Sequence, residues 1–241
     1  MYISHHTDFI LSPLIKILQE GILVNKSIGD GIESYPTGEY IMQALFLKMT
    51  GAQEQKMKCI CWDMATVDYD YRYDYLNNKT YGEHSDIKAK NGIYKDLIAS
   101  IKKRDGSFEV KSMLDEEFLT SILTKINELY NESQFIVWQS RDYASYFAQY
   151  KQDIKSNQIG NESTMFESTL GELYKDIVYR HRNRCAHNTL SYQQNKPDLA
   201  GLSEKNYDKH NYFYRFTLLV LIDEIFIALF KKYLSLQEDM D

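Results

Sequence analysis

The sequence predicts an all-α protein, a helical bundle, and three observations lead to this fold class. Residues that interrupt helices are scarce, with 11 Gly and 3 Pro in 241 residues. Apolar side chains recur at helical spacing over about 8–24, 163–186 and 205–236. No internal repeat or low-complexity linker divides the chain. We therefore expect a single domain over residues 1–241, at least about 60% helical and without a substantial sheet.

The N-terminal part of the chain predicts two helices separated by a loop. The first extends over about 8–24, with Pro13 in its opening turns, where proline is tolerated. A stretch with Gly and Pro at 25–36 predicts the loop. A long helix is then expected from Thr37, a candidate N-cap, with Gly51 as a candidate kink.

The tyrosine-rich stretch that follows is compatible with two structures. The long helix could continue to Leu76, because Cys61 and Met64 lie at helical spacing before it. A strand is the alternative, because tyrosines alternate from Tyr69 to Tyr75. We favour the helix, since no partner strand is evident nearby.

The middle of the chain predicts three further helices. A polar loop at 77–91 precedes them. They are expected at about 92–104, 115–130 and 134–156.

The C-terminal part predicts a helix that ends in polar residues and a last, apolar helix. The first opens at Ser163 or Thr164, and Thr164 with Glu167 has capping-box spacing. A loop is expected at 188–204. The last helix, at about 205–236, is apolar on most faces, so we expect it to lie centrally in the bundle.

Charge and cysteine content limit the classes of function. The formal net charge is −6, whereas proteins that coat nucleic acid are usually basic, so any RNA contact must rest on a local basic patch. Three cysteines are too few for a disulfide scaffold and indicate a reducing compartment, the cytoplasm. Cys59 and Cys61 would lie about 200° apart on a helix, and His5 and His6 lack a third ligand nearby. We expect neither a metal nor a cofactor.

No segment predicts a membrane span or a leader. The most apolar run, Phe216–Phe230, contains Asp223 and Glu224 and is too short to cross a bilayer. The N-terminus lacks the basic residues that begin a signal peptide. We therefore expect no contact with a membrane.

The segment most specific for a function is Arg182-Asn183-Arg184-Cys185-Ala186-His187, at the end of a predicted helix. The apolar stripe of that helix continues to Val178, and Arg182 lies four residues beyond it. An arginine at the edge of an apolar stripe is placed to face a groove or a partner rather than bulk solvent.

This segment resembles the active-site motif of the HEPN superfamily of ribonucleases, an Arg-x(4–6)-His pattern that often has a polar residue after the arginine. Arg182, Asn183 and His187 match it, at the four-residue spacing. The resemblance implies a HEPN-like core at about 130–241, with the N-terminal helices packed on it. It also implies a homodimer that brings two motifs together across a cleft, and a metal-independent endoribonuclease with these three residues as catalytic residues.

The chemistry of such an enzyme needs no metal. RNA carries its own nucleophile in the 2′-OH. The imidazole of His187 can take that proton, and the guanidinium of Arg182 can hold the phosphate and stabilise the transition state. The resemblance further implies 2′,3′-cyclic phosphate and 5′-OH ends, and a toxin–antitoxin or phage-defence setting with an antitoxin or regulatory protein as partner.

Three basic residues flank the motif and have two interpretations. Arg180, Arg184 and His181 could extend the RNA-binding surface. The arginines could equally complement the helix dipole, and His181 could be a histidine at the edge of the core, since it lies three residues beyond Val178.

The sequence leaves open which arginine binds the phosphate. Arg180 also fits the pattern, at six-residue spacing. In an unbroken helix Arg180, Asn183 and His187 share a face, and Arg182 lies about 140° from His187. Arg182 therefore requires either a distortion near Cys185 or a cleft wide enough to gather both side chains.

Other interpretations remain beside the enzyme. The chain could be a non-catalytic helical module that binds RNA or a protein through the same cleft, or a structural subunit with a coincidental motif. Asp223 or Glu224 could orient His187 from a neighbouring helix. Some HEPN toxins carry a tyrosine, modified by a partner nucleotidyltransferase, where this chain has Thr189, and Tyr192 is the nearest tyrosine. We do not expect that scheme here.

Overall fold

The computed structural model describes residues 6–26, 28, 31–78, 84–187 and 207–238. Of these residues, 82% are helical, and the one β feature among them is an isolated antiparallel bridge between Ile159 and Phe166. The all-α fold class is therefore confirmed. No helix in this part of the chain combines the length and apolar character of a bilayer-spanning segment.

Two long helices dominate the bundle, α3 (Tyr35–Val67) and α13 (Tyr212–Glu238). The shorter helices, in chain order, are α1 (Thr7–Leu11), α2 (Ile15–Asn25), α4 (Tyr69–Asn78), α5 (Ile87–Lys102), α6 (Val110–Met113), α7 (Glu116–Asn131), α8 (Phe135–Trp138), α9 (Ser140–Asp153), α10 (Ser168–Tyr174) and α11 (Arg180–His187). Single turns of 3-10 helix lie at Ile32–Ser34, Ser156–Gln158 and Tyr207–Lys209, and a π turn lies at Lys175–Tyr179.

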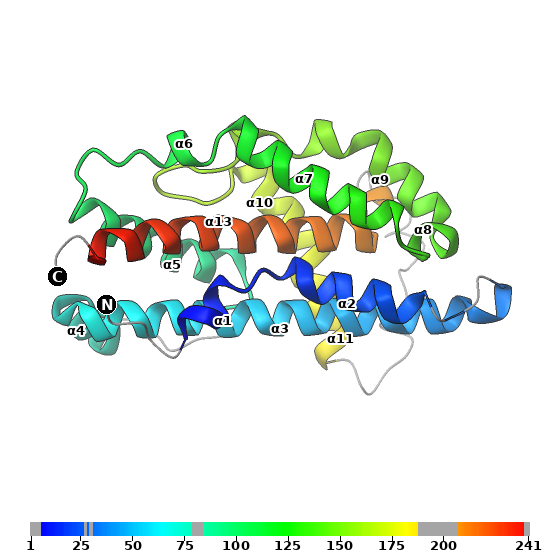
Figure 1. Cartoon of the computed structure of the whole chain (residues 1–241), viewed down its shortest axis with the longest axis horizontal. Helices are drawn as coiled ribbons and strands as arrows, with labels where there is room; N and C mark the ends of the chain where they lie inside the picture. The colour runs from blue at the N-terminus through cyan, green and yellow to red at the C-terminus, as the bar shows by residue number, and fades with distance from the viewer. Residues whose placement is uncertain (1–5, 27, 29–30, 79–83, 188–206, 239–241) are drawn as a thin grey trace.

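Helix α13 lies at the centre of the molecule (Figure 1). It packs against α3, α5, α7 and α9. From Tyr212 to Phe230 every side chain is buried except Glu224 and Ala228, which are half-buried. The predicted central position of the last helix is confirmed, although the helix begins later than expected. The predicted loop at 188–204 lies outside the described residues.

One continuous hydrophobic cluster extends from Ile10 to Tyr233 and draws on nearly every helix. Burial of apolar surface on this scale is the main stabilising contribution in a protein of this size. The single-domain organisation and the limits 130–241 of a HEPN-like core stay predictions. The motif helix α11 packs against α3, which belongs to the N-terminal part of the chain.

The prediction of one continuous first helix is wrong, because the helix is interrupted between Leu11 and Ile15. Proline has no N–H and its ring clashes with the carbonyl four residues earlier, so Pro13 ends α1 rather than opening a longer helix. Side chains from α3 and α13 hold the segment between α1 and α2.

A buried ion pair joins α3 and α13 to this break. Lys56 Nζ lies 2.6 Å from Asp223 Oδ1, and both side chains are almost completely buried. Asp223 Oδ2 accepts a hydrogen bond from the backbone N–H of Leu14 (2.7 Å), and Lys56 also donates to the carbonyl of Ser12. The pair therefore satisfies backbone groups that the break leaves without helical partners.

The long helix begins at Tyr35, slightly before Thr37, and continues through Gly51 without interruption. It does not reach Leu76, because Asp68 has extended backbone geometry (φ −111°, ψ 111°) and ends it. The Asp68 carboxylate then accepts the backbone N–H of Tyr71 and starts α4. The helical interpretation of the tyrosine-rich stretch is confirmed as a separate helix, and the strand is wrong.

The middle helices follow the prediction with shifted ends. Helix α7 agrees closely, with Asp115 as its N-cap. Helix α5 begins before residue 92, because the Asp86 carboxylate accepts the backbone N–H of Ala89 (2.6 Å) and caps it. The helix predicted at 134–156 is divided into α8 and α9 at Gln139.

The helix predicted from Ser163 or Thr164 is wrong at its start. Gly160 has a positive φ of 73°, which favours glycine, and the chain turns back there. The backbone N–H of Glu167 donates to the carbonyl of Gln158 (2.8 Å). This turn places residues 163–167 outside the helix, so the Thr164–Glu167 capping box does not form and α10 begins at Ser168.

Candidate functional site

The motif lies in α11, directly after the π turn at Lys175–Tyr179. In this turn the backbone N–H of Arg180 donates to the carbonyl of Lys175, five residues back. A π turn accommodates one residue more than an α turn and often lies at functional sites. The carbonyl of Ile177, within the turn, accepts a hydrogen bond from Arg215 Nε of α13 (2.9 Å). A buried arginine of the central helix therefore supports the turn.

The motif residues themselves form a regular α-helix, Arg180–His187. The distortion near Cys185, one of the two alternatives that the sequence left open, is absent from this helix, and the π turn lies before the motif. Arg182 and His187 therefore stay about 140° apart around the helix axis. A phosphate-binding role for Arg182 therefore requires the second alternative, a cleft wide enough to gather the side chains of both positions. The side chain of His187 lies outside the described residues, and its catalytic role stays a prediction.

Arg182 is held by two oxygen-bearing side chains. Its Nη2 donates to Glu54 Oε2 of α3 (3.4 Å), and its Nη1 donates to Asn183 Oδ1 (3.2 Å). The side chains of Arg182 and Glu54 are only 16% and 14% exposed. The guanidinium is thus fixed at the edge of the bundle, in contact with Asn183.

The carboxylate of Glu54 is shared between two cations. Its Oε1 lies 3.1 Å from Nζ of Lys58, one helical turn further along α3, and its Oε2 binds Arg182. Lys58 is 44% exposed, so the cluster reaches from the solvent into the bundle. One carboxylate therefore pairs with two positive charges.

A narrow recess lies beside Arg182. Its volume is about 10 Å³, which is close to the space that one water molecule needs. Residues of α3, α10 and α11 line it together with one residue of α5, Lys90. The recess therefore connects Arg182 to a lysine at a distant position in the sequence.

Lys90 is buried, with only 2% of its surface exposed. Its Nζ donates to the backbone carbonyls of His84 and Ser85 and lies 5.8 Å from the ring centre of Tyr174. Burial lowers the pKa of Lys90 to about 7; the carboxylates of Glu54 and Asp86 oppose this shift and the charge of Arg182 adds to it. Near neutral pH this lysine therefore exists in both its charged and its neutral form.

The opposite side of α11 is apolar. His181 packs against Phe46 and Tyr212, with ring centres 5.1 and 5.5 Å away. Its Nε2 lies 3.3 Å from the Tyr212 hydroxyl and 3.5 Å from Cys185 Sγ. Burial lowers the pKa of His181 to about 2, so it carries no charge toward RNA at neutral pH. Its packing is that of the core-edge histidine, the alternative left open by the sequence.

The two remaining flanking arginines differ in their surroundings. Arg180 is 60% exposed and pairs with Asp176, one turn earlier (2.9 Å). Arg184 is half-buried, and its charge helps to lower the pKa of Arg215. Burial, the larger cause, lowers the pKa of Arg215 to about 10, which leaves it charged at neutral pH. The RNA-binding roles of Arg180 and Arg184 stay predictions.

Three residues of this region were missed by the sequence analysis. Lys90 carried a usable signal, because it lies on the buried side of α5, where apolar residues are expected. Arg215 carried the same signal in the apolar last helix. Glu54 carried none, because its contact with Arg182 spans 128 positions of sequence.

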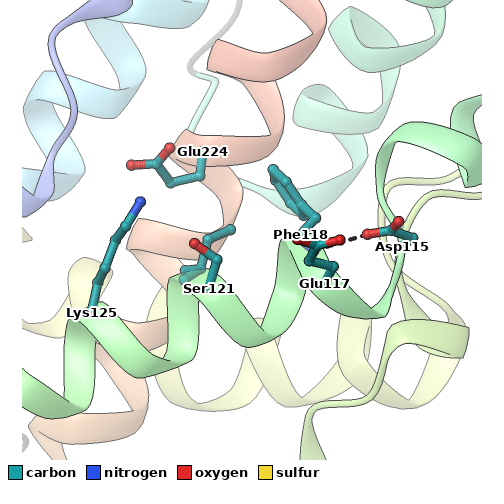
Figure 2. A pocket seen from close by; sticks show the side chains of 7 residues that line it. Asp115, Glu117, Phe118, Ser121, Lys125 and Glu224 are labelled. Atoms are coloured by element: carbon teal, nitrogen blue, oxygen red, sulfur yellow. Dashed lines mark hydrogen bonds between the residues drawn. The ribbon is translucent and has the colours of Figure 1, made fainter.

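The two acids that could orient His187 differ in their surroundings. Both carboxylate oxygens of Asp223 are used by Lys56 and the backbone of Leu14, which argues against that role. Glu224 lines a hollow of about 290 Å³ together with residues of α7, and Figure 2 shows Lys125 pointing toward it. The role of Glu224 toward His187 stays a prediction.

The site offers a cationic group rather than a set of metal ligands. Within the described ranges, no three side chains of His, Cys, Asp or Glu lie close enough to hold a metal ion. A guanidinium with five planar N–H donors suits the oxygens of a phosphate. An anionic substrate is therefore the ligand class that Arg182 fits. Comparisons of the chain with protein-family models, with curated proteins and with solved structures found no match.

Proposed function

We propose that the protein is a metal-independent endoribonuclease of the HEPN type that acts as a homodimer. The observation that carries the proposal is the motif itself, Arg182-Asn183-x3-His187 at the end of a helix, with Arg182 held by Asn183 and Glu54. An arginine held in this way keeps a fixed position near the surface, from which its N–H donors can bind a phosphate that displaces Glu54.

In the proposed reaction the 2′-oxygen of a ribose attacks the adjacent phosphorus. His187 takes the proton of the 2′-OH, and Arg182 binds the non-bridging phosphate oxygens, where negative charge grows. The bond from phosphorus to the 5′-oxygen breaks, and that oxygen receives a proton. The products are a 2′,3′-cyclic phosphate and a 5′-OH end.

The regular geometry of α11 favours a composite site. Within one copy of the helix, positions 182 and 187 lie about 140° apart around the axis, which is unsuited to binding a single phosphate. A two-fold axis beside α11 would place Arg182 of one subunit opposite His187 of the other. Arg180 and Arg184 would extend the basic surface along the RNA, and Asn183 would orient Arg182.

We place this activity in a toxin–antitoxin or phage-defence setting, where an antitoxin or regulatory protein restrains the enzyme. The motivation is the resemblance alone. Purification of the protein from a strain that also carries the genes beside its own should yield a stable complex with an inhibitory partner. A free, fully active enzyme in growing cells would contradict this setting.

The decisive experiment incubates purified protein with total RNA in EDTA and maps the cut ends. We expect cleavage that leaves 2′,3′-cyclic phosphate and 5′-OH ends, and no cleavage by His187→Ala. Cleavage that requires a divalent metal would contradict the mechanism. Binding of RNA without cleavage would favour the non-catalytic module. Light scattering at micromolar concentration is expected to give a dimer, and a monomer would count against the composite site.

A further inference from the structure

We propose that Lys90 is a positioning residue for Arg182, and that its charge, through the shared carboxylate of Glu54, decides how available Arg182 is to an RNA phosphate. This inference rests on the proposed function. Lys90 itself cannot touch RNA, because it is 2% exposed. It is therefore a support for the motif and not a catalytic residue.

The geometry connects the three groups. Lys90 and Arg182 line the same narrow recess from two different helices. Glu54 binds Arg182 directly at 3.4 Å, and its charge also acts on Lys90. The carboxylate of Glu54 thus acts on both Lys90 and Arg182, so a change in the charge of Lys90 alters the electrostatic balance at Arg182.

The charged and titratable groups around Lys90 come from every element packed against it. Among the described residues they are Glu54 and Lys58 of α3, His84 and Asp86 before α5, Tyr174 of α10, and Arg182 of α11. Burial lowers the pKa of His84, so His84 is mainly neutral at neutral pH. Lys58 is half-exposed and stays solvated. Lys90 is thus the buried group of this cluster whose charge changes near neutral pH.

The sign of the effect follows from Coulomb's law. A charged Lys90 attracts Glu54 and repels Arg182, which weakens the hold of Glu54 on the guanidinium. When Lys90 is neutral, the carboxylate of Glu54 interacts only with the charges of its ion-pair partners Arg182 and Lys58 among these three cations. Since the pKa of Lys90 is about 7, lower pH should release Arg182 toward a phosphate and higher pH should retain it against Glu54.

The chain supplies a matched control in Lys56, which is also 2% exposed. Lys56 binds Asp223 in the core and does not line the recess of Arg182. Lys56→Met and Lys90→Met therefore remove the same buried side chain type, and only the second removes it beside the motif.

The first test follows the Arg182 Nε–Hε signal in ¹⁵N-labelled full-length protein from pH 5.5 to 8.5, without RNA. In wild type we expect a pH step near 7 that persists in His187→Ala and in Lys56→Met and disappears in Lys90→Met. Glu54→Gln should move the step to lower pH, because Glu54 raises the pKa of Lys90. A wild-type signal without a step, or a step unchanged in Lys90→Met, would overturn the inference.

The second test measures binding of a 2′-O-methyl oligoribonucleotide, which has no nucleophilic hydroxyl. Wild type should bind it more tightly at pH 6 than at pH 8, and the ratio should fall by about five-fold in Lys90→Met but not in Lys56→Met. An unchanged ratio would also overturn the inference. If Lys90→Met does not fold, the shift in Glu54→Gln decides the matter.

The two tests separate this inference from the proposed function. If wild type cleaves RNA in EDTA but Lys90→Met keeps the pH step, the enzyme stands and the role of Lys90 is wrong. If wild type cleaves no RNA but the Arg182 signal follows Lys90, the electrostatic link stands and the ribonuclease is wrong.

Discussion

Two lysines of this protein are equally buried, yet their surroundings differ. Lys56 and Lys90 are each 2% exposed. Lys56 meets a carboxylate, Asp223, at 2.6 Å, whereas the hydrogen bonds of Lys90 end on the backbone carbonyls of His84 and Ser85. A buried charge is tolerated when a partner of opposite charge and hydrogen bonds compensate for lost solvation. Lys56 has both, and Lys90 shares its nearest acids with other groups.

The two lysines thus mark a structural centre and a candidate functional centre. The Lys56–Asp223 pair holds the break between α1 and α2 against the central helix. The Lys90 region adjoins Arg182 and the carboxylate of Glu54. We expect disruption of the first to lower the stability of the fold and disruption of the second to lower the rate of RNA cleavage.

The largest expected effect is on the rate of RNA cleavage, when Arg182 or His187 of the candidate functional centre is replaced. Arg182→Ala and His187→Ala should each lower the cleavage rate by about 10²- to 10⁴-fold, while circular dichroism and light scattering stay as in wild type. Arg182→Lys should also be poor, because an ammonium group cannot reproduce the planar fork of donors. If His187→Ala cleaves RNA as fast as wild type, the motif at residues 182–187 is not the active site.

At the structural centre, Lys56→Met should lower the free energy of unfolding by about 3–5 kcal/mol, because it leaves Asp223 buried without its partner. Denaturant unfolding would measure this loss. The double replacement Lys56→Met and Asp223→Leu should recover much of it. If the double variant is no more stable than the single one, the backbone contacts at Ser12 and Leu14 matter more than the charge.

A smaller effect concerns the pH dependence of stability. Because the pKa of Lys90 is lowered to about 7 from an unfolded value of 10.5, the unfolded chain binds more protons between these values. The free energy of unfolding should therefore rise with pH in this window, by up to about 1.4 kcal/mol per pH unit from this group. Lys90→Met should flatten the rise in pH-dependent unfolding, and an unchanged slope would mean that Lys90 titrates normally.

The smallest expected effect belongs to Arg180. Its ion pair with Asp176 is largely exposed, and such pairs contribute about 0–1 kcal/mol. Arg180→Ala should therefore lower the free energy of unfolding by no more than about 1 kcal/mol. It should change the cleavage rate by no more than a few-fold. This variant also checks the register of the motif. If it harms cleavage far more than Arg182→Ala does, the phosphate-binding arginine is Arg180.

Much of the fold could be predicted from the sequence because it follows from the burial of apolar runs and from the capping of helices by nearby polar residues. The long apolar run of α13 had to be buried, and the polar residue Asp115 marked the start of α7. Where prediction failed, backbone geometry prevailed over side-chain periodicity. Pro13 divided a periodic stretch, and the positive φ of Gly160 redirected residues that had a good capping pattern.

The candidate site was only partly predictable, for a different reason. The motif itself is a local pattern, so its helix was evident. Glu54 of α3 binds Arg182 and Lys90 of α5 lies across the recess from it, and no local pattern links either residue to position 182. The π turn was also unpredicted, because its extra residue is stabilised by Arg215, more than thirty positions away.

That π turn makes the site sensitive to chain length. It holds one residue more than an α turn, and each residue of an α-helix corresponds to a rotation of about 100°. In-frame loss of a single codon within Lys175–Tyr179 would let the turn revert to α-helix and rotate α11 away from Glu54, with every motif residue unchanged. In an alignment the motif of such a chain would look intact, although Arg182 would no longer lie beside Glu54.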